Sequence, residues 1–264
     1  MSETKTPYVI VPCAGFGKRF KDEGYAEEKP LIEVGGRRLL AWSLTCLPEA
    51  WWLGRGIVVL RRDQIALREQ LEGFHQVLLD GPTQGAACSV LAAAVGLPPD
   101  APVLVMNADQ YFRVGASVQY RHTDDICATI PREIVGLDGF HTWALEDNWA
   151  GFILTFPGKG PAWSYAVTNG TNRVVHVIEK KEVSPYATVG VYWWRRAADL
   201  VRSICAMIAV GQKTNAEFYL APSFNFLPLS DKNVQIVPVE DFMGLGTPEQ
   251  VRAFEARLKE GWTP

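Results

Sequence analysis

Glycines and cations are concentrated in the segment from residue 12 to residue 31. An apolar strand is expected at residues 8–11, and Gly15 and Gly17 in the following turn let backbone N–H groups approach an anion without a Cβ in the way. Three cationic side chains follow: Lys18, Arg19 and Lys29. A triphosphate would use both the N–H groups and the cations, so these residues predict a phosphate-binding turn.

Two common glycine loops fit this segment less well. The dinucleotide fingerprint Gly-x-Gly-x-x-Gly needs a third glycine for close helix packing, and Phe20 stands at that position. The Walker A loop needs Ser or Thr directly after Gly-Lys, where this sequence has Arg19. A plain surface turn after the first strand stays open as the alternative.

Asp109 follows an apolar run at residues 103–106 and is the strongest candidate metal ligand in the sequence. Magnesium prefers one or two carboxylates together with phosphate oxygens and water, so a single well-placed aspartate is sufficient to anchor it. The alternative is an aspartate that caps a loop or the next helix.

Composition restricts the classes of protein that this chain can belong to. Its 264 residues are 48% hydrophobic and 21% charged, which is enough for one large core. A net charge of −3 argues against nucleic acid or an anionic membrane as the main partner, because both require a broad basic field. No apolar run approaches the roughly 18 to 20 residues of a membrane span, and no signal-peptide pattern opens the sequence, so we expect a cytoplasmic protein without membrane insertion.

The five cysteines are widely spaced and lie mostly in apolar segments, as reduced core thiols do. They lack Cys-x-x-Cys spacing, and the four histidines are scattered along the chain. We therefore expect neither a disulfide framework nor a structural zinc site.

The first half alternates short apolar runs with helical patterns. Strands are expected at residues 8–11, 56–60, 76–79, 103–106 and 126–130, and helices at 38–47, 63–71, 85–95 and 115–122. This rhythm predicts an α/β fold with a mostly parallel central sheet and helices on both faces. Such sheets bind ligands beyond the carboxyl ends of their strands, where both the glycine turn and Asp109 would lie.

The second half reads as a mixed or antiparallel extension of the sheet. Strands are expected at residues 149–156, 163–167, 173–179, 188–194 and 234–239, and helices at 197–209, 217–226 and from 248 onward. Without a repeat or a low-complexity linker, residues 1–264 are interpreted as one domain. Its nucleotide-binding lobe would span about residues 1–135, and its acceptor-binding lobe, with the C-terminal helix, about 136–264.

Seven motifs in one order resemble the sugar-phosphate nucleotidyltransferases, the NDP-sugar pyrophosphorylase-like family. They are Ala14-Gly15-Phe16-Gly17-Lys18-Arg19-Phe20, Lys29-Pro30-Leu31, Thr83-Gln84-Gly85-Ala86-Ala87, Asn107-Ala108-Asp109, Val177-Ile178-Glu179-Lys180, Ala187-Thr188-Val189-Gly190-Val191-Tyr192 and Gly246-Thr247-Pro248-Glu249. The segment 215–222 and the spacing before Lys29 further resemble a branch found with bacterial capsule and surface-polysaccharide biosynthesis, which includes cytidylyltransferases of unusual phosphorylated acceptors. The implied fold is the nucleotide-diphospho-sugar transferase (GT-A, Rossmann-like) fold.

The resemblance implies a reaction in which an acceptor phosphate attacks the α-phosphorus of an NTP and pyrophosphate leaves. It assigns Arg19 to the leaving phosphates and Lys29 to the α-phosphate and the incoming phosphate, because positioning and charge neutralisation carry such reactions. It also implies Mg²⁺ at Asp109. Related pyrophosphorylases have a second acid where this chain has Gly244, so Asp241 is the alternative second ligand.

Other residues acquire binding roles through the same resemblance. The implied nucleotide-binding residues are Ala14, Gly15, Gly17, Lys18, Gln84, Gly85 and Asn107. The implied acceptor-binding residues are Glu179, Lys180, Trp163, Asn215 and Glu217. Each has an ordinary structural alternative, such as a helix-start polar group for Gln84 or a core aromatic for Trp163.

The function predicted from these residues is transfer of a nucleotide, with CTP favoured, to a phosphorylated small molecule such as a sugar phosphate. A glycosyltransferase of related fold is the alternative, although Asp109-Gln110-Tyr111 lacks the second acid of an Asp-x-Asp pair. A catalytically inactive nucleotide-binding regulator is disfavoured because Arg19, Lys29 and Asp109 are all present. The base, the acceptor and the oligomeric state, a homo-oligomer included, are left open by the sequence.

Overall fold

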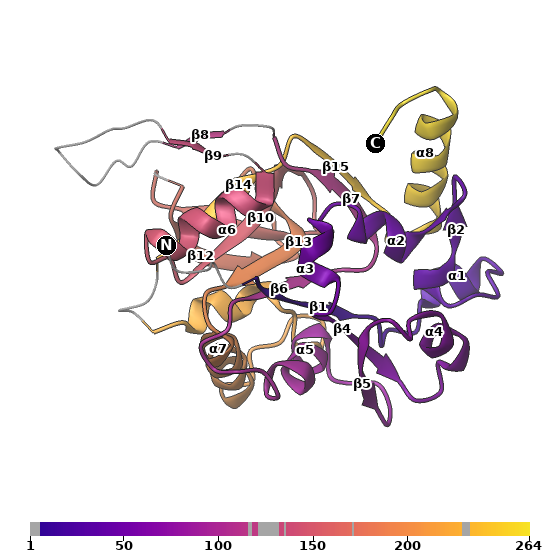
Figure 1. Ribbon diagram of the computed structural model, residues 1–264, viewed down its shortest axis with the longest axis horizontal. Helices are drawn as coiled ribbons and strands as arrows, with labels where there is room; N and C mark the ends of the chain where they lie inside the picture. Colours follow the sequence, from indigo (N-terminus) through magenta and orange to yellow (C-terminus); the bar gives the residue numbers. More distant parts are fainter. Residues whose placement is uncertain (1–5, 116–117, 121–131, 135, 171, 229–232) are drawn as a thin grey trace.

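The computed structural model has a central sheet of nine strands in its described residues (Figure 1). The described residues are 6–115, 118–120, 132–134, 136–170, 172–228 and 233–264. The strand order is β12-β11-β13-β6-β1-β4-β5, and β10 pairs with both β13 and β14 beside this path.

Four neighbouring strands of this sheet are parallel: β1 (Tyr8–Pro12), β4 (Gly56–Arg61), β5 (His75–Leu79) and β6 (Val103–Met106). The central strands are apolar along their length because helices cover both faces of the sheet. In β1, Val9 and Val11 pack into the core on one face while Ile10 packs into the core on the other.

The second half of the chain continues the same sheet with strands of mixed direction. They are β10 (Gly151–Pro157), β11 (Ser164–Thr168), β12 (Val174–Glu179), β13 (Tyr186–Trp194) and β14 (Val234–Pro238). The strand β13 pairs antiparallel with β6 and thereby joins the two halves of the chain. The predicted α/β fold with a mostly parallel sheet and a mixed extension is confirmed.

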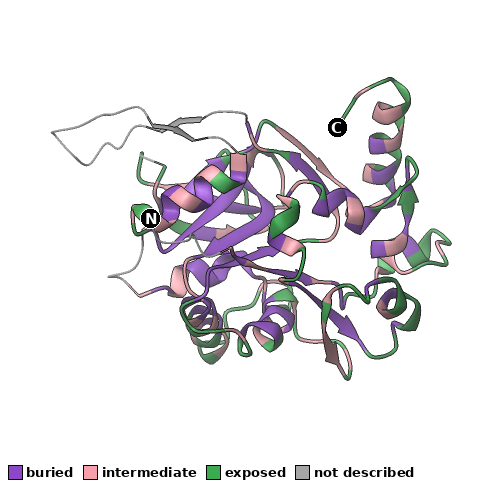
Figure 2. Ribbon diagram, in the orientation of Figure 1, coloured by how far each residue is buried: buried purple, intermediate pink, exposed green. Residues whose placement is uncertain are grey.

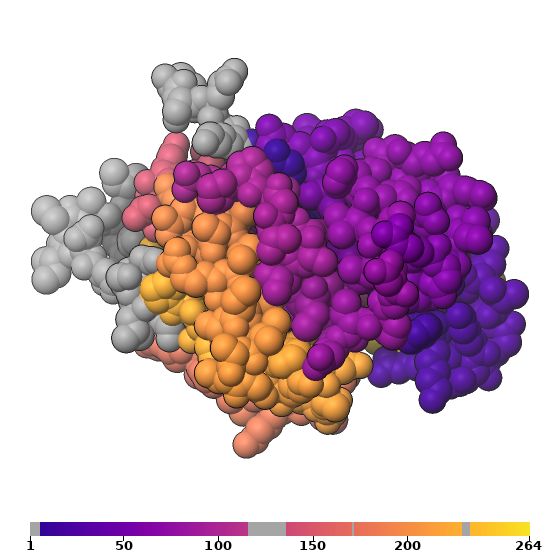
Figure 3. Space-filling view, turned by 90° about the horizontal axis from the view of Figure 1, so that it is seen from below, coloured from indigo at the N-terminus to yellow at the C-terminus, as the bar shows by residue number. Residues whose placement is uncertain are grey.

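Helices cover both faces of the sheet, and the strands between them are largely buried (Figures 1 and 2). On one face lie α2 (Leu39–Leu44), α3 (Glu49–Trp52) and α6 (Gly136–Glu146). On the other lie α5 (Ala86–Ala94), α7 (Ala197–Ala209) and the 3₁₀ helix η2 (Ala221–Phe226). Figure 3 shows this second face, where the magenta first half and the orange second half of the chain lie side by side.

A third apolar cluster holds the segments that flank the glycine turn. It joins α1 (Lys18–Asp22), β2 (Glu33–Val34), α2 and α8 (Pro248–Lys259), and its centre is Phe20, Trp42 and Phe254. Trp42 and Phe254 meet edge to face with ring centroids 5.1 Å apart. A capping box fixes the start of α8, because the Thr247 side chain accepts from the Gln250 N–H while the Gln250 side chain accepts from the Thr247 N–H.

Short elements complete the described structure. They are η1 (Lys29–Leu31), β3 (Arg37–Arg38), α4 (Ile65–Gln70), β7 (Gln110–Arg113), β8 (Val118–Tyr120), β9 (Arg132–Ile134) and β15 (Asp241–Gly244). Three two-stranded sheets pair β7 with β15, β2 with β3, and β8 with β9. In the described residues, no helix is both long enough and apolar enough to cross a bilayer.

Two predicted helices differ from the structure. The helix expected at residues 115–122 is wrong, because residues 118–120 form strand β8, in keeping with the β-branched and aromatic residues that alternate there. The helix expected at 217–226 is limited to the 3₁₀ segment at 221–226, with Pro222 in its first turn. The strand expected at 126–130 lies outside the described residues, and α6 was not predicted.

Candidate active site

A cavity of about 330 Å³ lies beyond the carboxyl end of β6, between the two halves of the chain. This volume is within the range of small-molecule sites, and the position is where parallel sheets bind ligands. Six of the residues predicted for the site line it: Arg19, Asn107, Asp109, Trp163, Glu179 and Lys180. Segments far apart in the sequence therefore meet at one cavity.

The glycine turn follows β1 and presents unpaired backbone donors. Within the described residues, the N–H groups of Ala14, Gly15, Phe16 and Gly17 have no hydrogen-bond acceptor. Gly17 adopts φ = 62°, and a Cβ there would lie 3.2 Å from the Cβ of Lys29. A glycine is therefore needed both for the left-handed backbone and for the close approach of Lys29.

Lys29 and Asp109 form an ion pair that joins η1 to the end of β6. The ammonium group of Lys29 also lies 3.5 Å from the carbonyl oxygen of Gly246. The two charged side chains are 23% and 25% exposed, so water screens them only in part. Lys29 does not itself line the cavity, but it is paired with Asp109, which does.

Gly190 gives Asn107 and Gln110 the space that they occupy. Its backbone has φ = 87°, and an added Cβ would lie 2.3 Å from Nδ2 of Asn107 and 2.7 Å from Oε1 of Gln110. The N–H of Asn107 donates to the Gly190 carbonyl over 3.0 Å. The backbone of β13 thus positions the polar residues that follow β6.

Glu179 and Lys180 lie at the end of β12, on the side of the cavity formed by the second half of the chain. The hydroxyl group of Ser164 donates to the Glu179 carboxylate. Burial raises the pKa of Glu179, while the Ser164 hydrogen bond and the positive charge of Lys180 lower it in part. Lys180 has φ = 56°, a backbone conformation that costs energy without glycine, and its ammonium lies 4.9 Å from the ring centroid of Tyr219.

Aromatic side chains form another part of the cavity wall. Trp163 and Phe242 both line the cavity, with ring centroids 5.4 Å apart. Phe156 packs against both, with its ring centroid 5.1 Å from that of Trp163 and 4.1 Å from that of Phe242. The wall is therefore a fixed apolar surface beside the Glu179–Lys180 pair, suited to the face of a sugar or cyclic polyol.

Asp241, the predicted alternative second metal ligand, forms an ion pair in the described residues. Its carboxylate accepts from the guanidinium of Arg257 over 3.2 and 3.3 Å, and among the described residues Asp241 does not line the cavity. Gly244 does line it, and a Cβ at Gly244 would lie 2.8 Å from Nε2 of Gln250. The amide of Gln250 therefore fills the space into which a side chain at position 244 would point.

The Gln84–Gly85 turn lies at the start of α5, against the segment that carries Tyr219. The Phe218 N–H donates to the Gln84 carbonyl over 2.7 Å, and Lys213 donates to the Gln84 side-chain oxygen over 2.6 Å. Gly85, at φ = 128°, leaves no room for a Cβ, which would lie 2.5 Å from the Phe218 carbonyl oxygen. Ala86, the next residue, lines the cavity.

Several predicted residues lie beside the cavity and do not line it. In the described part these are Ala14, Gly15, Gly17, Lys18, Gln84, Gly85, Asn215 and Glu217. Asn215 and Glu217 are exposed in a turn closed by backbone hydrogen bonds between Thr214 and Glu217. This turn precedes the cavity-lining residue Tyr219.

Two cavity residues, Ser164 and Gln250, make contacts that the sequence did not predict, because these contacts depend on the fold. Ser164 follows the predicted residue Trp163, but its hydrogen bond to Glu179 depends on the antiparallel register of β11 and β12, where the two residues are partners. Gln250 carried one usable signal, its place three residues after Thr247 in a capping box. Nothing in the sequence indicated that its amide would lie against Gly244.

Cys13 precedes the glycine turn, and its side chain is buried. Burial, together with the nearby negative charge of Asp109, raises its pKa to about 12, although Lys29 lowers it in part. Four cysteines in the described residues are unpaired: Cys13, Cys46, Cys88 and Cys205.

Comparison with known proteins supports the class that this geometry defines. Residues 9–127, which include the glycine turn, Lys29 and Asp109, match the family model of the MobA-like NTP transferase domain. The match covers less than half of the chain, and it supports the predicted enzyme class, a nucleotidyltransferase. A search of curated proteins finds no match.

Three solved structures share the fold at low identity. A nucleoside-diphosphate-sugar pyrophosphorylase from Vibrio cholerae is 20% identical with a TM-score of 0.73, over 94% of this chain and 99% of that one. A glucose-1-phosphate thymidylyltransferase from Bacillus anthracis, in complex with a sucrose, is 14% identical with a TM-score of 0.65, over 97% and 96%. The inositol-1-phosphate CTP transferase from T. maritima is 13% identical with a TM-score of 0.63, over 98% and 99%.

The steric role of Gly190 gives a first prediction. Gly190→Ala should destabilise the protein by about 1 to 3 kcal/mol and weaken nucleotide binding, because the new methyl group must displace Asn107. Urea unfolding and nucleotide titration measure the two effects. Gly170→Ala is the matched control, because Gly170 has the same φ of 87° with nothing within 4 Å of its Cβ position. Equal losses in the two variants would contradict the displacement of Asn107.

The raised pKa of Glu179 gives a second prediction. A carboxyl group whose pKa is higher in the folded than in the unfolded state loses stabilisation as pH rises through the folded value. The free energy of unfolding of Glu179→Gln, minus that of the wild type, should therefore increase as pH rises from about 4.5 to about 8. Urea unfolding across this range tests it. The exposed Glu72→Gln is the control, and a constant difference between wild type and Glu179→Gln would refute the burial effect.

Proposed function

We propose that the protein joins a nucleoside triphosphate to a phosphorylated small-molecule acceptor and releases pyrophosphate. One observation carries the proposal. The Lys29–Asp109 ion pair lies between a turn with free N–H groups and a cavity that also contains Glu179 and Lys180. A donor triphosphate and an acceptor phosphate could thus approach the same two charged groups from opposite sides.

In the proposed reaction an acceptor phosphate oxygen forms a bond to the α-phosphorus, and the bond from that phosphorus to the β-phosphate bridging oxygen breaks. The electron pair leaves with pyrophosphate. Arg19 would bind the departing phosphates with its planar guanidinium, and Lys29 would neutralise the α-phosphate and the incoming phosphate. The turn N–H groups would bind phosphate oxygens, and its residues Ala14, Gly15, Gly17 and Lys18 make up that part of the nucleotide site.

Asp109 is the proposed ligand for Mg²⁺. Its carboxylate faces the cavity, which fits an ion that takes one or two carboxylates and completes its shell with phosphate oxygens and water. When bound, the ion would neutralise phosphate charge. Since Asp241 is paired with Arg257 and position 244 is a glycine, we leave Asp241 out of the proposed metal site.

The acceptor side favours a phosphorylated sugar or polyol. Glu179 can accept hydrogen bonds from hydroxyl groups, Lys180 can pair with a phosphate, and Trp163 and Phe242 provide an apolar wall for a ring face. The three similar proteins are named for a nucleoside-diphosphate sugar, glucose 1-phosphate and inositol 1-phosphate, which supports this class. Asn215 and Glu217 are proposed to border the acceptor through the Tyr219 segment.

Finer parts of the proposal rest on the sequence resemblance. We propose CTP as the nucleotide, with Gln84, Gly85 and Asn107 on its nucleoside side, and a role in cytoplasmic synthesis of capsule or surface-polysaccharide precursors. The chain is proposed to act as one domain, because both halves contribute strands to one sheet. A glycosyltransferase is the second candidate, and it is less favoured because Tyr111 stands where the second acid of an Asp-x-Asp pair would follow Asp109.

The activity itself is the third prediction. Purified protein with Mg²⁺ should release pyrophosphate from one NTP only when a phosphorylated acceptor is present, because in-line attack needs that oxygen. A coupled pyrophosphate assay with the four ribonucleotides and dTTP, against a panel of sugar and polyol phosphates, measures it. Silence across the panel would reject the proposal, and transfer of sugar from a finished nucleotide sugar would favour the glycosyltransferase.

The fourth prediction concerns the central ion pair. Lys29→Ala should lower kcat at least about a hundredfold with nucleotide binding partly retained, because it removes charge stabilisation of the transition state. Asp109→Asn should shift the Mg²⁺ titration to higher concentration. Lys21→Ala and Asp22→Asn, exposed changes of the same charges in α1, are the controls. An unchanged rate in Lys29→Ala, or an unchanged titration in Asp109→Asn, would remove the corresponding role.

A further inference from the structure

Arg61, the last residue of β4, is buried behind the glycine turn with only 3% of its surface exposed. Its Nη1 donates to the carbonyl oxygens of Ala14 and Gly15 over 2.6 and 3.0 Å. Its Nε donates to the carboxylate of Asp63 over 3.0 Å. One planar guanidinium thus donates hydrogen bonds to two successive carbonyl groups of the turn.

Gln64 extends the same contact by one residue. Its side-chain oxygen accepts from the backbone N–H of Arg61 over 2.7 Å, which fixes the orientation of the amide. Its Nε2 then donates to the carbonyl oxygen of Cys13 over 3.1 Å. Gln64 is 1% exposed, so water does not compete for these bonds. Three consecutive carbonyls, from Cys13 to Gly15, therefore accept hydrogen bonds from two buried side chains, those of Arg61 and Gln64.

The direction of these carbonyls decides where the neighbouring N–H groups point. In a trans peptide the C=O and the following N–H lie on opposite sides of the bond. Carbonyls turned toward Arg61 and Gln64 therefore turn the N–H groups of Ala14, Gly15 and Phe16 away from them. These three N–H groups are among those without an acceptor in the described residues.

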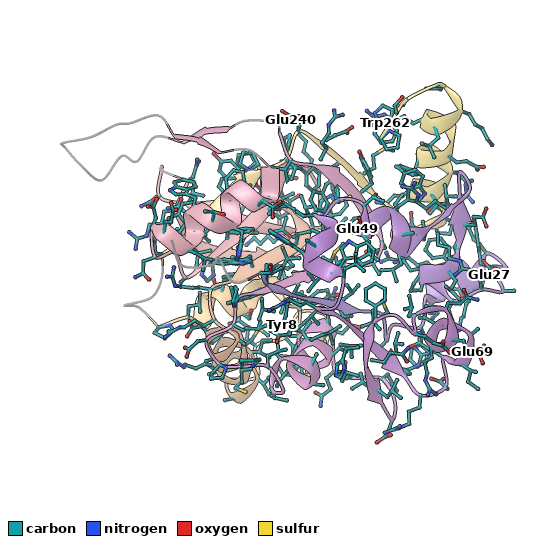
Figure 4. All side chains as sticks on the ribbon, viewed as in Figure 1. Tyr8, Glu27, Glu49, Glu69, Glu240 and Trp262 are labelled. Carbon is teal, nitrogen blue, oxygen red and sulfur yellow. The ribbon has the colours of Figure 1, made fainter. Side chains whose placement is uncertain are left out.

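The segment before Lys29 is tied to the same two side chains. The carboxylate of Glu28 accepts from Nε2 of Gln64 over 3.2 Å and lies 3.7 Å from Nη2 of Arg61. Figure 4 shows the exposed Glu27 at the outer edge of this segment, on the same side of the molecule as Glu69 of α4. Arg61 and Gln64 therefore hold both the turn and the residue next to Lys29.

An arginine fits this position better than a lysine. The guanidinium presents donors in several directions in one plane, and the ring of Phe16 covers it, with the guanidinium carbon 4.5 Å from the ring centroid. Lysine would keep the positive charge but could not hold the turn carbonyls and Asp63 at once. The charge of Arg61 is balanced by Glu28 and Asp63, so its burial is compensated.

We propose that Arg61, together with Gln64, is a positioning residue that sets the glycine turn with its N–H groups toward a polyphosphate and in register with Lys29. The inference deepens the proposed nucleotidyl transfer and rests on it for the identity of the natural ligand. Arg61 acts through the backbone of the turn and does not contact the phosphates itself.

The test compares Arg61→Lys with Arg62→Lys by calorimetric titration with inorganic tripolyphosphate, CTP and CMP. Arg62 is the matched control, because it is the adjacent arginine and is 60% exposed in a surface pair with Asp80. Arg61→Lys should weaken tripolyphosphate and CTP about tenfold and CMP less than about twofold, because the misplaced N–H groups serve the β- and γ-phosphates. Arg62→Lys should match the wild type.

A merely structural role for Arg61 predicts other results. Wild-type affinity in Arg61→Lys, equal losses for CMP and CTP, or no binding of tripolyphosphate to the wild type would overturn the inference. If Arg61→Lys does not fold, Glu28→Gln replaces it, with tripolyphosphate weakened about threefold and an unchanged affinity counting against the inference. Tripolyphosphate binding that depends on Arg61, without any pyrophosphate release by the wild type, would reject the proposed function and leave the inference standing.

Discussion

The ion pair between Lys29 and Asp109 is the contact on which the rest of the site depends. It joins residues 80 positions apart in the chain, and it forms because β1 and β6 are parallel neighbours whose carboxyl ends lie together. Each charge is partly withdrawn from water, so each needs the other or a ligand to compensate it. In the proposed function, bound phosphates would compensate the charge of Lys29 and a metal ion would compensate that of Asp109. The ion pair would then be the arrangement of these charges before substrate binds.

Close backbone approach surrounds this pair, and glycine makes it possible. Gly17 brings the turn against Lys29, Gly190 admits Asn107 and Gln110, and Gly246 would hold a Cβ only 3.0 Å from the Asp109 carboxylate. At position 244 the chain has a glycine with the Gln250 amide against it. Among the described residues, the carboxylates that line the cavity are Asp109 and Glu179. The proposed site therefore combines a single metal-binding carboxylate with a neutral amide on the same wall.

Both halves of the chain contribute residues to the cavity, and β13 connects the two halves. Its pairing with β6 places the strands of the first half beside the mixed strands of the second half, and Asp109 and Glu179 line one cavity. The aromatic wall of Trp163 and Phe242 is built entirely from the second half.

The sequence by itself determined the elements whose signals are local. Apolar runs bounded by turns predicted all the described strands of the main sheet, and the glycine turn, Lys29 and Asp109 were located because their residue types match phosphate and metal chemistry. Only the tertiary structure decided which distant groups meet. The sequence did not single out Arg61, and it offered Asp241 as a candidate ligand. In the structure, Arg61 is buried behind the turn and Asp241 is paired with Arg257. Hydrogen bonds and ion pairs of this kind depend on distances across the fold, which residue types and their spacing along the chain do not specify.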